Sequence, residues 1–139
     1  MSDGNNARLL DPLFTTDAMR EVFSDRATLQ AMLDFEAALA RALVATGRAP
    51  AGVLTAIEGA CRAEAFDTAS IGHAAASAGN LAIPLIAQLT RAVDRADKSA
   101  GTFVHFGATS QDVIDTALVL QLADALAALE QDLDRKSVV

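Results

Sequence analysis

The 139-residue sequence has one cysteine, three prolines and six phenylalanines, and it has neither tryptophan nor tyrosine. The single cysteine, Cys61, excludes an internal disulfide, and its helical surroundings predict a small buried apolar residue, not a reactive thiol. Residues that favour strands are scattered, whereas alanine, which has the best helix propensity and little bulk, is abundant. The composition therefore predicts an all-α protein with closely packed helices.

Positive charge is also scarce, because 11 Lys and Arg stand against 18 Asp and Glu and leave a net charge of −7. Nucleic-acid binding needs a basic face that displaces counterions, and the dispersed basic residues argue against a membrane-surface role. The sequence contains no apolar run near the roughly 20 residues that span a bilayer, and its start lacks the features of a signal peptide. We expect no nucleic-acid or membrane partner and a cytoplasmic location.

Capping and breaker residues divide the chain into helices. Thr15 or Thr16 is expected to cap the first, Ser24 or Asp25 the second and Asp67 or Thr68 the fourth. The fourth helix is expected to break near Gly72 or Gly79. We expect the helices at about 17–23, 25–46, 51–65, 68–79, 80–97 and from 110 onward. Residues 102–108 combine aromatic and β-favouring residues between glycines, which predicts an extended connection.

Glu36 interrupts an apolar stripe with helical period. The stripe consists of Leu29, Met32, Leu33, Leu39, Ala40 and Leu43. A carboxylate in this position could be a ligand or a catalytic group, but buried charge is tolerated mainly when it is paired. We therefore favour a structural ion pair for Glu36, and we interpret His73 as an ordinary helix residue.

Apolar residues cover more than one face of the last helix. They are Val113, Ile114, Ala117, Leu118, Leu120, Leu122, Leu126, Leu129 and Leu133. Such breadth predicts a helix surrounded by other helices, some of them from other subunits, and a tendency to associate. Because the sequence stops while this helix is still running, we expect a piece of a longer protein or an altered C-terminus.

Most of the candidate functional residues lie at 105–116, where the expected extended connection meets the last helix. Gly107 allows a tight turn beside a ligand, and Thr109 and Ser110 begin a long helix, whose unpaired N–H groups and dipole favour an anion. His105 could donate to that anion or move a proton near neutral pH. The alternative is a capping box with Asp112 in place of the usual Glu or Gln, and the residues alone leave both interpretations open.

Asp112 and Asp115 lie three residues apart and share a helix face. Two acids beside an anion site would repel the anion, so we expect them to bond backbone groups or basic partners as organisers of the site. No spacing typical of metal ligands is present.

The run HFGATSQDVIDT, residues 105–116, resembles the first signature of the fumarase/aspartase superfamily, TS-x-D-x-x-D-T. Residues 78–86, AGNLAIPLI, resemble a GN-x-x-I-P-L segment found in the adenylosuccinate lyase and carboxymuconate cycloisomerase branch. Residues 18–41 look most like the cycloisomerases, and the resemblance covers about residues 9–135.

The resemblance implies an organisation and a set of roles. It implies an N-terminal helical domain at 13–108 and the start of a central helical bundle at 109–139, in an enzyme that works as a homotetramer without a cofactor. Residues 1–12 are polar, contain Gly4 and end at Pro12, which predicts a flexible lead-in. Thr109 and Ser110 match residues that hold a substrate carboxylate, His105 matches a histidine beside the site, and Asn80 matches a position near the cleft. Gly107, Asp112, Asp115 and Thr116 match fixed motif positions.

Within the family, the cycloisomerase branch implies lactonisation of a carboxymuconate, a polycarboxylate, in protocatechuate breakdown through the β-ketoadipate pathway. Two alternatives are an adenylosuccinate lyase-type β-elimination, whose Arg-Tyr pair this sequence lacks, and a non-catalytic helical oligomerisation module. The family's second signature, with its helix-borne histidine, and its serine-bearing loop are absent. The motif also contains no Lys or Arg for a polyanion. We therefore expect this chain to carry part of an active site.

Overall fold

The computed structural model describes residues 11–137, and every regular element within that range is helical. The α-helices are α1 (Asp11–Phe14), α2 (Asp17–Val22), α3 (Asp25–Ala45), α4 (Val53–Ala60), α5 (Thr68–Ala78), α6 (Ala82–Ala96) and α7 (Ser110–Ser137), and two 3₁₀ turns are η1 (Ala63–Ala65) and η2 (Gly101–Phe103). The all-α prediction is confirmed. The lead-in expected at 1–12 lies almost wholly outside the described residues.

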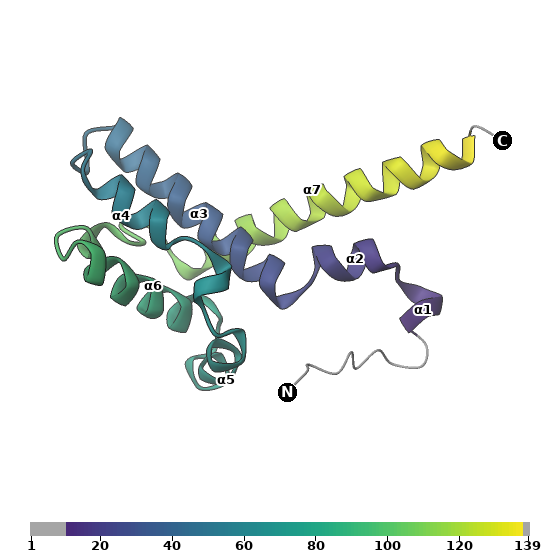
Figure 1. The fold of residues 1–139 in the computed structure, drawn as a ribbon, viewed down its shortest axis with the longest axis horizontal. Helices are drawn as coiled ribbons and strands as arrows, with labels where there is room; N and C mark the ends of the chain where they lie inside the picture. Colours follow the sequence, from purple (N-terminus) through teal and green to yellow (C-terminus); the bar gives the residue numbers. More distant parts are fainter. Residues whose placement is uncertain (1–10, 138–139) are drawn as a thin grey trace.

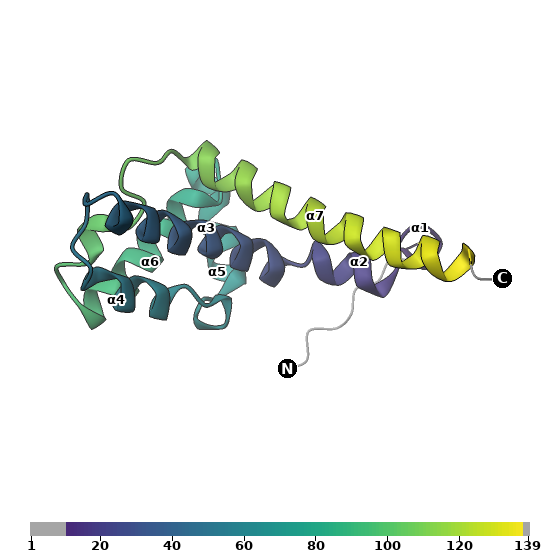
Figure 2. The same ribbon diagram turned by 90° about the horizontal axis from the view of Figure 1, so that it is seen from above.

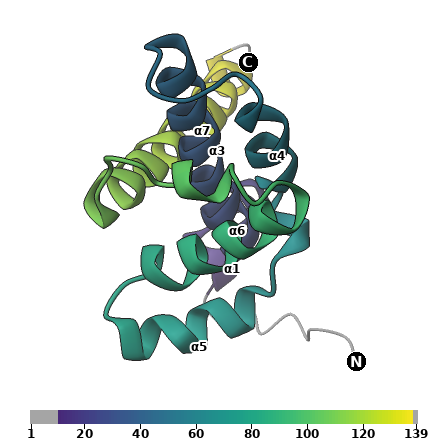
Figure 3. The same cartoon turned by 90° about the vertical axis from the view of Figure 1, so that its left-hand side faces the viewer.

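The two longest helices, α3 and α7, pack against each other and cross near the middle of Figure 1. Helix α4 packs on α3, α6 packs on both α4 and the start of α7, and α5 lies beyond α6 (Figure 3). The second half of α7 extends past this group with α2 alongside it (Figure 2). Among the described residues, no helix is both long and apolar enough to cross a membrane.

Local capping signals place several helix ends where the sequence predicts them. Thr16 accepts a hydrogen bond from the Met19 N–H, and Ser24 accepts one from Ala27. Asp67 accepts bonds from the first turn of α5, and Gly79 ends that helix at a φ of 85°. A positive φ favours glycine, which has no Cβ to clash. Gly72 does not break α5, because a helix tolerates an interior glycine at modest cost.

The expectation of one helix at 51–65 is wrong, because α4 ends at Ala60. The Gln30 side chain of α3 accepts a hydrogen bond from the Ala63 N–H at 2.9 Å and donates to the Cys61 carbonyl at 3.3 Å. These bonds hold the backbone in a non-helical turn, with η1 following. Cys61 itself is buried, as predicted.

The core lies between α3 and the helices around it. The apolar stripe of α3 is buried, except that Leu39 is only half-buried. Helix α6 contributes Leu85, Leu89 and Val93, which are fully buried. On α7 the buried positions recur every four residues, at Val113, Ala117, Gln121 and Ala125, and this narrow face packs on α3 and α2.

Candidate active site

The segment between η2 and α7 folds into tight turns, so the expectation of an extended connection at 102–108 is wrong. The Phe106 N–H donates to the Phe103 carbonyl, and the Ala108 N–H donates to the His105 carbonyl. His105 has a φ of 56° and Gly107 a φ of 80°, so two of three consecutive residues are left-handed. The β propensity of these residues does not make the segment extended, because no neighbouring strand is present for it to pair with. Gly107 and a long-range contact of His105 set the backbone conformation instead.

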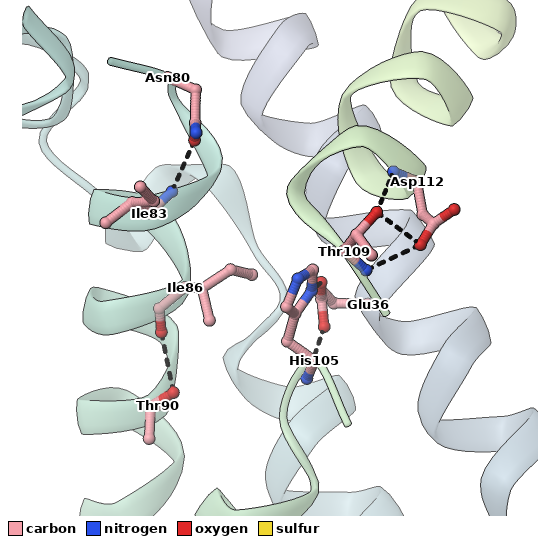
Figure 4. Close-up of polar contacts among 8 residues, drawn as sticks. All are labelled: Glu36, Asn80, Ile83, Ile86, Thr90, His105, Thr109 and Asp112. Carbon is pink, nitrogen blue, oxygen red and sulfur yellow. Dashed lines mark hydrogen bonds and ion pairs between the residues drawn. The ribbon is translucent and has the colours of Figure 1, made fainter. Parts of the chain in front are cut away.

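That long-range contact is with Glu36, which lies 69 residues earlier on α3. The Glu36 Oε2 atom accepts the His105 backbone N–H at 2.9 Å, and Oε1 lies 2.6 Å from His105 Nδ1. Figure 4 shows the carboxylate beneath the imidazole. The Glu36 side chain is 1% exposed and that of His105 is 17% exposed. The expectation that a buried carboxylate at this position is paired is confirmed, and the partner of Glu36 is the candidate site histidine.

Burial raises the pKa of Glu36, and the hydrogen bonds and charge of His105 oppose that rise. Desolvation disfavours the charged form, whereas hydrogen bonds to a carboxylate favour it. The backbone N–H can only donate, so Oε2 acts as an acceptor. With Glu36 ionised, Oε1 also accepts, and Nδ1 of His105 then carries a proton.

The start of α7 is a capping box. Asp112 Oδ2 accepts from the Thr109 N–H at 2.7 Å and from the Thr109 hydroxyl at 2.9 Å, and the Asp112 N–H donates to Thr109 Oγ1 at 3.3 Å. The hydrogen bonds from Thr109 lower the pKa of Asp112. The capping interpretation is confirmed, and so is the expectation that Asp112 bonds a backbone group. The expectation for Asp115 is wrong, because its partner is the side-chain amide of Gln111, one helical turn away on the same face.

The donors left for an anion at this helix start include those of the half-buried Ser110. The Ser110 hydroxyl and the backbone N–H groups of Ser110 and Gln111 make no hydrogen bond within the described part of the chain. They lie at the positive end of a 28-residue helix. The Thr109 hydroxyl already donates to Asp112, so it could donate to a ligand only after rotating away. Substrate binding by Thr109 and Ser110 stays a prediction.

The structure does not gather all the predicted residues at one point. Asn80 caps α6, since its Oδ1 atom accepts the Ile83 N–H at 3.1 Å (Figure 4). It lines a hollow of about 290 Å³ with α3 and α7 residues that include Met32 and Ile114. It makes no hydrogen bond to 105–112 within the described residues. Thr116 is half-buried on α7, and His73 is exposed on α5 as an ordinary helix residue.

The charge at the site is mostly negative. In the part of the chain that the structure describes, no Lys or Arg side chain bonds to Glu36, His105, Ser110 or Asp112. Among these same residues, no three His, Cys, Asp or Glu side chains gather to hold a metal ion. This arrangement can orient one carboxylate and place one imidazole beside it. It does not supply the cations that a polycarboxylate needs.

A family model described as "Lyase" matches residues 13–135, and the chain belongs to this lyase family. It is 55% identical over all 139 residues to the 3-carboxy-cis,cis-muconate cycloisomerase of Pseudomonas aeruginosa, and covers 30% of that protein. It is 56% identical to the protein of the same name from Bradyrhizobium diazoefficiens, over 91% of this chain and 28% of that one.

Solved structures agree with these relatives. The 3-carboxy-cis,cis-muconate lactonizing enzyme of Pseudomonas putida matches with a TM-score of 0.87 and 54% identity, over 90% of this chain and 28% of that one. A fumarate lyase from Mesorhizobium sp. BNC1 matches with a TM-score of 0.75 and 34% identity, over 85% of this chain and 27% of that one. The resemblance to the fumarase/aspartase superfamily is confirmed. The chain spans about 30% of the length of the relatives that it matches.

Proposed function

We propose that this chain forms part of an enzyme that converts 3-carboxy-cis,cis-muconate into a carboxymuconolactone. The proposal rests on sequence identity, which is higher to relatives named as cycloisomerases than to relatives named as other lyases. Three relatives named as cycloisomerases are 53 to 56% identical over 91% or more of the chain, and a fourth is 40% identical over 93% of it. Those named nitrosuccinate lyase and N-acetyl-S-(2-succino)cysteine lyase are 35 to 36% identical.

The proposed reaction is an isomerisation, so it needs no co-reactant. A carboxylate oxygen of the substrate adds to a carbon of a double bond in the same molecule and forms the lactone C–O bond. The π electrons move to the neighbouring carbon, where an adjacent carboxylate stabilises the enolate-like charge, and a proton is then delivered to that carbon. Such chemistry needs an anion cradle, stabilisation of the developing charge and a proton donor.

The site would offer the anion cradle and an imidazole that exchanges a proton with the substrate. The Ser110 hydroxyl and the first N–H groups of α7 would hold a substrate carboxylate, because they are unpaired donors at a helix start. Thr109 would fix this helix start through its bonds with Asp112 and would join the cradle if its hydroxyl rotates. The His105 imidazole would face the substrate through Nε2, since Glu36 occupies Nδ1.

The remaining parts would come from outside this chain. The described site contains no bonded Lys or Arg, and the relatives are more than three times as long. We propose that 13–108 is the N-terminal helical domain and that 109–139 begins a central bundle. The exposed Leu118, Leu122 and Leu126 on α7 support burial of this helix against other helices in a homotetramer. A cytoplasmic location stays a prediction.

The proposal is tested with the product of the complete reading frame that encodes this chain. 3-Carboxy-cis,cis-muconate absorbs in the ultraviolet through its conjugated double bonds, and lactonisation removes that conjugation. We expect the purified protein to abolish this absorbance and to leave adenylosuccinate intact. Cleavage of adenylosuccinate with unchanged muconate absorbance would assign the protein to the β-eliminating lyases. Inertness toward both, in a correctly folded oligomer, would favour a non-catalytic module.

A further inference from the structure

We infer that Glu36 is the positioning residue that selects which nitrogen of His105 meets the substrate and holds the turn that leads into α7. This inference rests on the proposed role of His105 at the site. Glu36 lies on a different helix from the motif, and its contribution is visible only in the folded structure.

Both carboxylate oxygens of Glu36 are committed to a single residue. Oε2 accepts the backbone N–H of His105 and Oε1 contacts Nδ1, at 2.9 and 2.6 Å. With Glu36 ionised, Oε1 accepts, and Nδ1 then carries the proton of the neutral ring. Nε2 has no hydrogen-bond partner in the described part of the chain, so it is the nitrogen left for a ligand.

The same carboxylate also holds the backbone. His105 is the only non-glycine residue with positive φ among those described, and such a strained conformation persists only where the surroundings enforce it. The bond from its N–H to a buried carboxylate supplies that enforcement. Because Gly107, Thr109 and Ser110 follow within five residues, the turn at His105 sets where α7 starts.

Two other roles for Glu36 fit the geometry less well. A proton carrier must reach the substrate, but the Glu36 side chain is 1% exposed and lies behind His105. A simple core residue would need no charge, and an apolar side chain of similar volume would avoid the desolvation that burial imposes here. Orientation of His105 accounts for both the burial and the paired contacts.

The variant Glu36→Gln tests this role with little change in shape. The glutamine has one accepting oxygen, and if that oxygen keeps the His105 backbone bond, its NH₂ group faces Nδ1. Nδ1 must then accept, and the proton of the neutral ring moves to Nε2. Without the Glu36 carboxylate, the doubly protonated ring that would deliver a proton from Nε2 also loses its stabilising negative charge, so we expect kcat to fall about 10²-fold, within the range of general acid–base contributions. KM should change by less than about 3-fold, because the helix-start donors remain.

Glu58→Gln is the matched control. Glu58 pairs with Arg41 at 2.6 Å on a half-exposed surface between α3 and α4, away from 105–112. The same chemical change there should leave kcat within about 2-fold. An equal loss in the two variants, or unchanged kcat in Glu36→Gln, would overturn the inference.

A spectroscopic readout separates this inference from the proposed reaction. In ¹⁵N-histidine-labelled complete protein, a long-range ¹H–¹⁵N spectrum at a pH where the rings are neutral reports the tautomer of each ring, and His105→Gln identifies its signals. We expect an Nδ1–H ring in the wild type and an Nε2–H ring in Glu36→Gln. An Nε2–H ring in the wild type would refute the role of Glu36, even if the variant failed to fold. Absent muconate turnover with the expected tautomers would refute only the substrate.

Discussion

Replacement of Gln121 by alanine should loosen α7 from the α2–α3 junction. Gln121 is one of two buried polar or charged residues in the described structure, and its Nε2 atom donates to the Val22 carbonyl at 2.8 Å and to Thr28 Oγ1 at 3.1 Å. The Val22 carbonyl accepts no other hydrogen bond in the described part of the chain, whereas the Thr28 hydroxyl also donates to the Ser24 carbonyl. The alanine variant would therefore leave one backbone carbonyl unsatisfied.

The expected loss of stability is about 1–2 kcal/mol. A typical internal hydrogen bond contributes about 1 kcal/mol net, and an unsatisfied buried acceptor costs about 1–3 kcal/mol. We place the total in the lower part of this range because a hollow of about 680 Å³ beside Gln121 and Val22 can admit water. A loss of this size lowers Tm by roughly 2–8 °C in a protein of this length or somewhat longer.

Thermal unfolding at one fixed protein concentration measures the effect. Gln131→Ala, on an exposed position of the same helix, should change stability by less than about 0.5 kcal/mol. Gln121→Leu keeps most of the volume and removes both bonds, so it should also destabilise. If Gln121→Leu is as stable as the wild type, the hydrogen bonds do not hold α7 in place and the reasoning is refuted.

Three further predictions concern a cap, a thiol and a surface. The folded-state pKa of Asp112 is lowered, so its contribution to stability is present above the unfolded value of about 3.8 and is lost as pH falls through the folded pKa. In urea unfolding, Asp112→Asn should be less stable than the wild type at neutral pH and equally stable in acid. A loss of stability that does not depend on pH would contradict this. Burial, and to a smaller extent nearby carboxylates, raise the pKa of Cys61 to about 12. A thiol reagent at pH 8 should therefore modify the native protein at least about 10²-fold more slowly than the urea-unfolded protein. Equal rates would disprove burial of the thiol. Leu126 is 60% exposed on α7, and Leu126→Glu should lower the sedimentation mass of the oligomer while Ser77→Glu on α5 leaves it unchanged; an unaltered mass in Leu126→Glu would place the subunit contact elsewhere.

The elements that the sequence predicts well are those with local causes. The caps at Thr16, Ser24 and Asp67 and the stop at Gly79 depend on residues within one helical turn, so they can be recognised without the fold. The end of α4 depends instead on Gln30, which lies about 30 residues earlier, and no local signal marks that bond.

In the candidate site too, contacts between residues close in sequence were predicted, and contacts between distant residues were not. The capping box of Thr109 and Asp112 spans four residues and was one of two interpretations that the sequence offered. The pairing of Glu36 with His105 joins positions 69 residues apart. The available signal was a carboxylate inside an apolar stripe, which must have a partner. That signal does not say which of the possible partners the fold brings to it.

The most direct test of the site compares Ser110→Ala with Ser77→Ala in the complete encoded protein. The Ser110 hydroxyl at the start of α7 has no hydrogen-bond partner among residues 11–137, and Ser77 is exposed on α5. Unlike Thr109, neither serine takes part in the capping box. A hydrogen bond to a charged group contributes about 1.5–3 kcal/mol, which corresponds to a fall in kcat/KM for 3-carboxy-cis,cis-muconate of about 10- to 100-fold. We predict this fall for Ser110→Ala and no change for Ser77→Ala. A kcat/KM of Ser110→Ala within about 2-fold of the wild type would contradict the assignment of the α7 start as the carboxylate site.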